Sequence, residues 1–338
     1  MSQTITVEAR KGILFILAGM AAISLNDVLI KHLSGGYALH QIVFARSSIA
    51  LIFTLVLVQL EGGFSILRTR NPVLHGLRGL MLVISNMSFF VALSVMPLAN
   101  VTALFFAAPL FITLLSIPVL GEKVGVMRMG AVVVGFIGVI IMQRPWEGSD
   151  SADVDRIVLL MPVLAALTYA LNQVFTRKLG ATTKASALAA YVQGAFILVS
   201  LGFYAVAGDG RYAQGVADPS MQFLLRAWIL PGASDWYLFL GLGFNAAIIG
   251  YCLSQAYRLA DAATVAPFEY IGLPLAVMWG WLIWADLPEW EVWLGMLLIM
   301  GAGLFVFLRE QQKARQIART GVGTGVGTGV GTGGRGRY

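Results

Sequence analysis

Three ionisable residues lie well inside long apolar segments: Asp27, Arg46 and Glu269. An ionised side chain at membrane depth is costly unless it is paired or hydrated, so each is a candidate for substrate binding or proton transfer. Asp27 and Arg46 lie at similar depths from the same ends of their segments, and Lys31 follows Asp27 by one helical turn. We expect Asp27 and Arg46 either to form a buried ion pair or to contact substrate directly.

Glu269 has no basic residue within two turns in its own segment, and it lies between Pro267 and Pro274. Prolines remove backbone hydrogen bonds and can kink a membrane helix, which leaves polar backbone for a cavity to use. A carboxylate beside such a kink suits an ammonium group or a proton. The alternative is a protonated glutamate that hydrogen-bonds to a neighbouring helix.

Uncharged polar residues accompany these three in the apolar segments. Asn26 and Asn172 occupy matched places in two similar stretches, residues 25–33 and 171–179. Simple helix-to-helix hydrogen bonds would also explain both residues. We expect the substrate-binding residues to come from the set Glu269, Asn86, Asn245, Tyr169, Asn172, Asp27 and Arg46.

Motifs for enzymatic chemistry are missing from the sequence. It contains no Gly-x-x-x-x-Gly-Lys-Ser/Thr loop for ATP and no Gly-x-Ser-x-Gly nucleophile elbow. Its three histidines, His32, His40 and His75, have no metal-ligand spacing, and the single cysteine, Cys252, excludes a disulfide framework. We therefore expect no catalytic site, no metal and no cofactor.

The elements that must position these residues are membrane helices. The chain is 58% hydrophobic and 12% charged with a mean hydropathy of +0.80, whereas a soluble domain carries roughly 25% charged residues. Apolar segments of about 20 residues recur, each long enough to cross a bilayer. They predict an all-α integral membrane protein with ten spans, at 12–32, 38–60, 76–96, 98–119, 126–142, 157–176, 185–206, 236–257, 263–284 and 290–308.

Basic residues predict the orientation, since cytoplasmic connections collect Lys and Arg. Of the 23 Lys and Arg residues, Arg46 lies within a span. With both termini cytoplasmic, seventeen of the others face the cytoplasm and only five face outward, namely Lys31, Arg144, Arg156, Arg211 and Arg226. The net charge of +6 then reflects cytoplasmic connections and not nucleic-acid binding.

The sequence repeats itself. Residues 25–33 read LNDVLIKHL and residues 171–179 read LNQVFTRKL. A proline precedes an acidic residue and then a glycine pair in both halves: Pro109, Glu122 and Gly130/Gly138, then Pro274, Asp286 and Gly295/Gly303. Five helices per repeat is an odd number, so the halves would insert with opposite polarity as inverted repeats.

The repeat divides the chain into five parts. Residues 1–11 form the cytoplasmic N-terminus, 12–142 the first repeat, 143–156 a polar linker and 157–308 the second repeat. Residues 309–338 form a basic, glycine-rich tail whose repeated Gly-Val-Gly-Thr cannot bury a core, so we expect it to be disordered. The long connection 207–235 contains Leu224, Leu225 and Trp228, which predict a short helix at the outer interface.

In the first half a proline is followed by Gly121-Glu122 and then by Gly130, and in the second half a proline is followed by Ala285-Asp286 and then by Gly295. Together with the ten spans, this pattern resembles the EamA-type drug/metabolite transporter superfamily over residues 11–308. Asp286 departs from the usual glutamate, whereas Arg46 matches a recurrent position. The chain looks most similar to YddG-type bacterial amino-acid exporters. The resemblance implies a basket of helices around a central cavity in the bacterial inner membrane, which exports small metabolites by alternating access as a monomer or homodimer.

Two other classes remain open. One is a transporter of other cargo, such as organic cations or sugar and nucleotide derivatives, although a phosphate carrier should place paired Lys or Arg in its cavity. The other is a non-transporting membrane scaffold or sensor, which should lack polar residues directed at a common centre. The lipid bilayer is an expected partner in all of these classes, and a small-molecule substrate is an expected partner of either kind of transporter.

Overall fold

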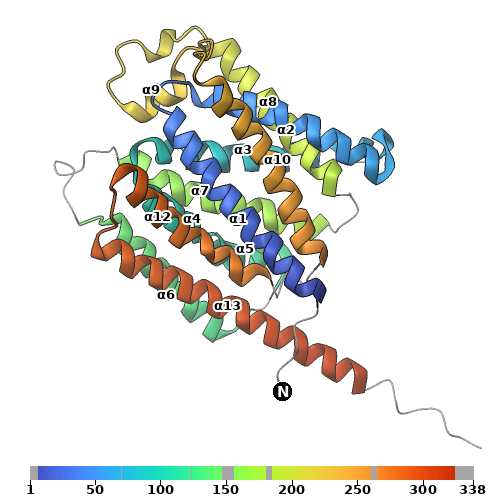
Figure 1. Cartoon of the computed structure of the whole chain (residues 1–338). Coiled ribbons are helices and arrows are strands. Elements are labelled where there is room, and N and C mark those ends of the chain that lie inside the picture. Colours follow the sequence, from blue (N-terminus) through green and yellow to red (C-terminus); the bar gives the residue numbers. More distant parts are fainter. Residues whose placement is uncertain are drawn as a thin grey trace, which may run out of the picture.

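The structure is a computed structural model that describes residues 7–69, 71–122, 124–146, 156–179, 185–259 and 265–323. Within these ranges all regular structure is helical (Figure 1). The first half contains α1 (Val7–Leu33), α2 (Leu39–Gly62), η1 (Phe64–Leu67), α3 (Pro72–Val95), α4 (Leu98–Phe105), α5 (Ala108–Leu120) and α6 (Val126–Gln143). The second half contains α7 (Arg156–Leu179), α8 (Ala185–Ala207), η3 (Arg211–Ala213), α9 (Pro219–Leu225), α10 (Trp236–Leu259), η4 (Ala266–Ile271), α12 (Gly272–Trp284) and α13 (Trp290–Gly323).

The described residues include nine helical stretches that are long and apolar enough to cross a bilayer, with α4 and α5 counted together as Leu98–Leu120. The tenth expected span, 263–284, has a different form. Its first residues lie outside the described ranges, and the rest divides into the 3-10 helix η4 and the 13-residue α12. The chain is therefore an integral membrane protein, with nine such helices in its described part where we expected ten.

Prolines explain the broken helices. We expected one helix over 98–119, but α4 ends at Phe105 and α5 begins at Ala108. Pro109 has no backbone N–H, and its ring would clash with the carbonyl four residues earlier. The backbone tightens instead, and the Ala107 amide bonds the Leu104 carbonyl at 3.1 Å. The kink expected near Pro267 and Pro274 is present as the junction between η4 and α12.

Helix pairing follows a simple pattern. α1 packs against α10 and α3 against α7, α2 pairs with α8, and α6 pairs with α13. Two further contacts join α10 to α2 and α3 to α8. The halves can be exchanged so that α1, α2, α3 and α6 trade places with α7, α8, α10 and α13. This exchange leaves the α2–α8 and α6–α13 pairs unchanged and turns each of the other four pairs into another of the four.

The α6–α13 pair runs along one side of the bundle (Figure 1), and glycines let the two backbones meet. A Cβ on Gly138 would lie 3.0 Å from the Gly295 carbonyl oxygen, and a Cβ on Gly295 would lie 2.9 Å from that of Gly138. Close packing through small residues is how membrane helices gain van der Waals contact. The helix also extends further than expected, since α13 continues past 308 to Gly323. No glycine or proline interrupts 309–320, and residues 324–338 lie outside the described ranges.

The connections gather at two ends of the bundle, which we call the α9 end and the opposite end. At the α9 end, Tyr37 bonds Asp235, Arg226 bonds Gly35, and the αL residue Arg144 pairs with Glu289 and Glu291. At the opposite end, the Ser186 hydroxyl donates to Glu61 and the Tyr191 hydroxyl donates to the Leu67 carbonyl. The expected helix in 207–235 is α9, which includes Leu224 and Leu225 but ends before Trp228.

Candidate functional site

Asn26, Asp27 and Arg46 are brought together in the bundle interior, and all three are at most 9% exposed. The Arg46 Nη1 donates to the Asn26 Oδ1 at 3.4 Å, and the Asn26 Nδ2 donates to the Asp27 Oδ1 at 3.2 Å. A direct ion pair, one of the two arrangements expected for Asp27 and Arg46, is not formed within 4.0 Å between these described side chains. The amide of Asn26 links them instead, because its two ends can bond opposite charges.

Aromatic rings surround the Arg46 guanidinium. Its central carbon lies 5.7 Å from the centre of the Phe90 ring and 5.4 Å from that of Phe196. Cation–π attraction strengthens when the cation is removed from water, as it is here. Arg46 is therefore held by α3 and α8 as well as by α1.

Lys31 is not the partner of Asp27. Its Nζ donates to the Met96 carbonyl at 2.5 Å and lies 5.1 Å from the centre of the Trp284 ring. These contacts hold the ammonium group toward the α9 end, away from the interior. Asp27 thus keeps Asn26 as its hydrogen-bond partner.

Two of the expected asparagines donate hydrogen bonds to backbone carbonyls. The Asn245 Nδ2 donates to the Ala22 carbonyl at 2.7 Å and ties α10 to α1. The Asn86 Nδ2 donates to the Leu82 carbonyl within its own helix at 3.0 Å. Asn245 is 7% exposed, and the carbonyl that it bonds belongs to Ala22, one turn before Asn26 on α1.

A second polar group forms where α4, α7 and η4 meet. Tyr169 accepts a hydrogen bond from the Gln173 Nε2 at 2.7 Å, and its ring centre lies 5.4 Å from that of Phe105. The Glu269 carboxyl is close enough to Tyr169 for the two to interact electrostatically. Asn172, 4% exposed, lies one residue before Gln173 on α7.

A row of phenyl rings connects the two polar groups. Phe90, which faces Arg46, lies 5.6 Å from Phe89 between ring centres, and Phe89 lies 5.4 Å from Phe105, which in turn contacts Tyr169. We did not identify Phe89 and Phe90 from the sequence. Their adjacency to Asn86 and Ser88 on a span rich in polar residues was the available signal. The interior therefore runs from a cation, along aromatic rings, to a carboxylate.

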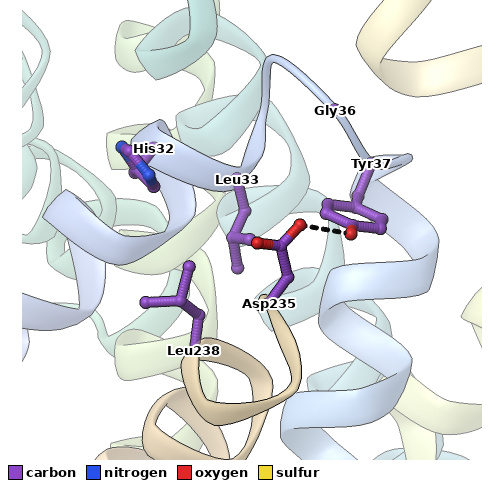
Figure 2. A pocket seen from close by; sticks show the side chains of 6 residues that line it. All are labelled: His32, Leu33, Gly36, Tyr37, Asp235 and Leu238. Carbon is purple, nitrogen blue, oxygen red and sulfur yellow. Dashed lines mark hydrogen bonds between the residues drawn. The ribbon is translucent and has the colours of Figure 1, made fainter. Parts of the chain in front are cut away.

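Two cavities lie away from this row. One, of about 310 Å³, opens between α2, α8 and α10 toward the opposite end. One of its lining residues, Gln193, lies one turn from Phe196 on α8 and so close to the Arg46 group. The other cavity, of about 150 Å³, lies at the α9 end around the Tyr37–Asp235 bond (Figure 2). None of the expected substrate-binding residues lines either cavity.

The described residues contain no group of three or more His, Cys, Asp or Glu side chains placed to hold a metal ion. Cys252 is buried in α10 as a free thiol. The side chains in the interior can thus pair with charges, donate and accept hydrogen bonds, and stack against rings.

Comparison with protein families finds a match over residues 10–144 to the EamA-like transporter family. A riboflavin transporter of Vibrio cholerae is 30% identical over 90% of this chain and 96% of its own length. An S-adenosylmethionine uptake transporter of Rickettsia prowazekii is 27% identical over 89% of this chain and 94% of its own length. The pseudopaline exporter CntI of Pseudomonas aeruginosa is 27% identical over 87% of this chain and 94% of its own length.

A solved crystal structure has a similar fold, with a TM-score of 0.55 at 19% identity over 91% of this chain and 98% of that one. The three sequence relatives are named as two transporters and an exporter, and none of the three is named for amino-acid export. The narrower resemblance to YddG-type exporters therefore stays a prediction.

Proposed function

Because the chain belongs to the EamA-like transporter family, we propose that it carries a small metabolite with an amino-acid head group across the bacterial inner membrane. It is a small-molecule transporter and not an enzyme. The proposal adds the cargo class, export as the direction, and alternating access as the mechanism. It also adds the orientation, with both termini in the cytoplasm.

The arrangement of Arg46, the phenyl rings and Glu269 is the observation that carries this proposal. A guanidinium can bind a carboxylate, and a carboxylate can bind an ammonium group. The row Phe90–Phe89–Phe105–Tyr169 lies between these charges, so the two ends cannot both bind one amino-acid head group. Arg46 would bind the carboxylate of the head group, the rings would contact the apolar or aromatic part of the cargo, and Glu269 would take a cationic group at the far end of the cargo or the coupling proton. Asn26 and Asn245 supply neutral hydrogen-bonding groups close to the Arg46 end.

Two inverted halves would supply the alternating access. The pairing of helices is unchanged when the halves are exchanged, which supports a two-fold relation between them. Both halves also contain a span that breaks near a proline, at Phe106–Ala107 and at Ile271–Gly272. Such discontinuous helices are typical of binding sites in secondary transporters.

A planar, ring-bearing metabolite is the second candidate cargo, and the same row of rings favours it. The relatives named for riboflavin and S-adenosylmethionine carry molecules with fused heteroaromatic rings. The cavity of about 310 Å³ agrees with such a cargo, since it is lined by Phe53, Tyr251, Gln193 and Gln255. A multiply phosphorylated cargo fits poorly, because Arg46 is the sole Lys or Arg among the buried residues of the described chain.

Transport into proteoliposomes tests the proposal. Radiolabelled methionine, phenylalanine, S-adenosylmethionine and riboflavin are followed in both directions, with and without a pH gradient. The Glu269→Gln variant keeps the shape of the side chain and removes its charge. Glu8→Gln, a change at an exposed position near the N-terminus, is the matched control.

We expect saturable transport of at least one amino-acid-bearing solute, which Glu269→Gln abolishes or makes insensitive to pH while Glu8→Gln leaves it intact. Transport of riboflavin alone would favour the ring-bearing cargo. Normal kinetics and an unchanged pH profile in Glu269→Gln would remove Glu269 from the binding site.

A further inference from the structure

The two ends of the α2–α8 pair differ in what fills them. The helices run antiparallel, so the last half of α2 meets the first half of α8 at the opposite end, where Ser186 bonds Glu61 at 2.6 Å. The cavity of about 310 Å³ opens there, lined by side chains from Phe53 to Glu61, from Ser186 to Gln193, and from α10. At the α9 end the first turns of α2 meet the last turns of α8, and a side chain from 208–235 fills this junction.

That side chain is Trp228. Its ring centre lies 4.5 Å from that of Tyr204 on α8, and 5.2 and 5.8 Å from those of Phe44 and His40 on α2. His40 also stacks on Phe203 at 5.7 Å and is fully buried. The indole thus occupies the space between the two helices at this end.

Hydrogen bonds hold the segment on both sides of Trp228 to the start of α2. The Gln41 Nε2 donates to the Ile229 carbonyl at 2.5 Å, and the Ile229 amide donates back to the Gln41 Oε1 at 3.2 Å. Arg226 donates to the Gly35 carbonyl at 2.8 Å. The Tyr37 hydroxyl donates to Asp235 at 2.5 Å and accepts from the Gly232 amide at 3.1 Å (Figure 2).

The packing around Trp228 nevertheless leaves polar atoms without hydrogen-bond partners. The indole Nε1 and the His40 Nε2 are both buried without a hydrogen-bond partner among the described atoms. A buried polar atom without a partner is unfavourable, so part of the packing energy is offset. The segment also belongs to a long connection between α8 and α10, whereas the matching connection in the first half, between α2 and α3, is only 63–71. An extended connection held by side-chain contacts can leave without unfolding a helix.

We propose that residues 226–232 form a removable plug at the outer mouth, with Trp228 as the group that closes it. The proposal rests on the proposed transport function. In this structure Trp228 fills the α2–α8 junction at the α9 end, and the cavity between α2, α8 and α10 opens toward the opposite end, so this junction is closed at the α9 end and open at the opposite end. Release of Trp228 from His40, Phe44 and Tyr204 then opens the path on the outer side.

Cysteine accessibility tests the plug independently of the cargo. In a Cys252→Ala background, Ser200→Cys places a thiol on α8 one turn inward from Phe203, where Ser200 is fully buried. Gln193→Cys places a second reporter in the open cavity. A membrane-impermeant thiol reagent is added to either side of sealed vesicles, and labelling rates are compared with and without Trp228→Ala.

We expect Trp228→Ala to raise the labelling rate of Ser200→Cys from the outside by about tenfold or more, the shift that corresponds to about 1.4 kcal/mol. Trp228→Phe keeps a ring and should restore slow labelling. Trp236→Ala, an exposed tryptophan at the start of α10, is the matched control and should have no effect. Gln193→Cys should react from the cytoplasmic side in every variant.

Unchanged labelling of Ser200→Cys in Trp228→Ala would overturn the plug, even where transport is confirmed. Labelling of Gln193→Cys from the outside would overturn the assignment of the closed end. A Gln41→Cys, Ile229→Cys pair provides a second measurement. Its disulfide should stop transport reversibly, and undiminished transport with the disulfide formed would equally contradict the plug. Failure of the cargo assignment alone would leave the labelling pattern intact.

Discussion

Replacing Gly138 by alanine should loosen the seam between α6 and α13. The new Cβ would lie 2.9 Å from the Leu298 Cβ, 3.0 Å from the Gly295 carbonyl oxygen and 3.3 Å from the Ile299 Cγ1. Two of these atoms are backbone or fixed to backbone, so side-chain rotation cannot relieve the crowding. The helices must separate by several tenths of an ångström.

The magnitude follows from two opposing effects. Overpacking of a close contact costs about 1–3 kcal/mol, and alanine in place of glycine within a helix gains about 1 kcal/mol. Gly130→Ala is on the same helix but meets nothing within 4 Å, so it keeps the propensity gain without the crowding. The difference in unfolding free energy between the two variants isolates the crowding and should be about 1–3 kcal/mol.

Chemical denaturation in detergent micelles measures this difference in unfolding free energy. Size-exclusion chromatography of heated samples gives an independent ranking of the variants. Gly301→Ala, which also meets nothing within 4 Å, repeats the control on α13. Equal stabilities of Gly138→Ala and Gly130→Ala would refute the close approach of α6 and α13. A Gly138→Ala variant more stable than Gly130→Ala would refute it more strongly.

Two further predictions concern a helix end and the buried charges. Ala285 ends α12 with a φ of +56°, and Gly121 ends α5 with the same two backbone hydrogen bonds. Ala285→Gly should therefore stabilise the fold by about 1 kcal/mol, and Gly121→Ala should destabilise it by a similar amount. Chemical denaturation of both variants measures this, and a loss of stability in Ala285→Gly would contradict it. Asp27→Asn should lower the free energy of unfolding by about 1.5–3 kcal/mol, because Arg46 loses the charge that it reaches through Asn26. The double variant Asp27→Asn, Arg46→Gln should recover part of the folded yield. A double variant with no better yield than Asp27→Asn alone would exclude the coupling.

Most of the helices could be predicted from the sequence because local signals determine them, whereas the end of α4 at Phe105 and the end of α13 at Gly323 were not predicted. Apolar length located the spans, and Pro267 and Pro274 predicted the break before α12. Pro109 carried the same information for α4 and α5, but the apolar run around it is continuous and hid the break. The 13-residue α12 shows why length alone is a weak guide, since part of the span 263–284 is a 3-10 helix.

The interior could be predicted in composition but not in geometry. Asp27, Arg46 and Glu269 were identifiable because charge is rare at membrane depth. That Asn26 stands between Asp27 and Arg46 depends on how α1 and α2 are rotated against each other, which hydropathy does not encode. The row of phenyl rings depends on three helices at once. Phenylalanine is so common in membrane spans that Phe89 and Phe90 carried only the weak signal of lying beside Asn86 and Ser88. Trp228 was attributed to a short interfacial helix, because the local sequence does not encode its contacts with α2 and α8.

The continuation of α13 beyond the bilayer has a practical consequence for imaging. The helix has 34 residues and so is about 50 Å long, whereas the hydrocarbon core is only about 30 Å thick. A 36.3 kDa protein that is mostly embedded in a micelle offers little outside it by which single particles can be aligned. A soluble helical protein fused in register to the protruding part of α13 would inherit its direction, and through the Gly138–Gly295 contact it would be fixed to the body of the bundle.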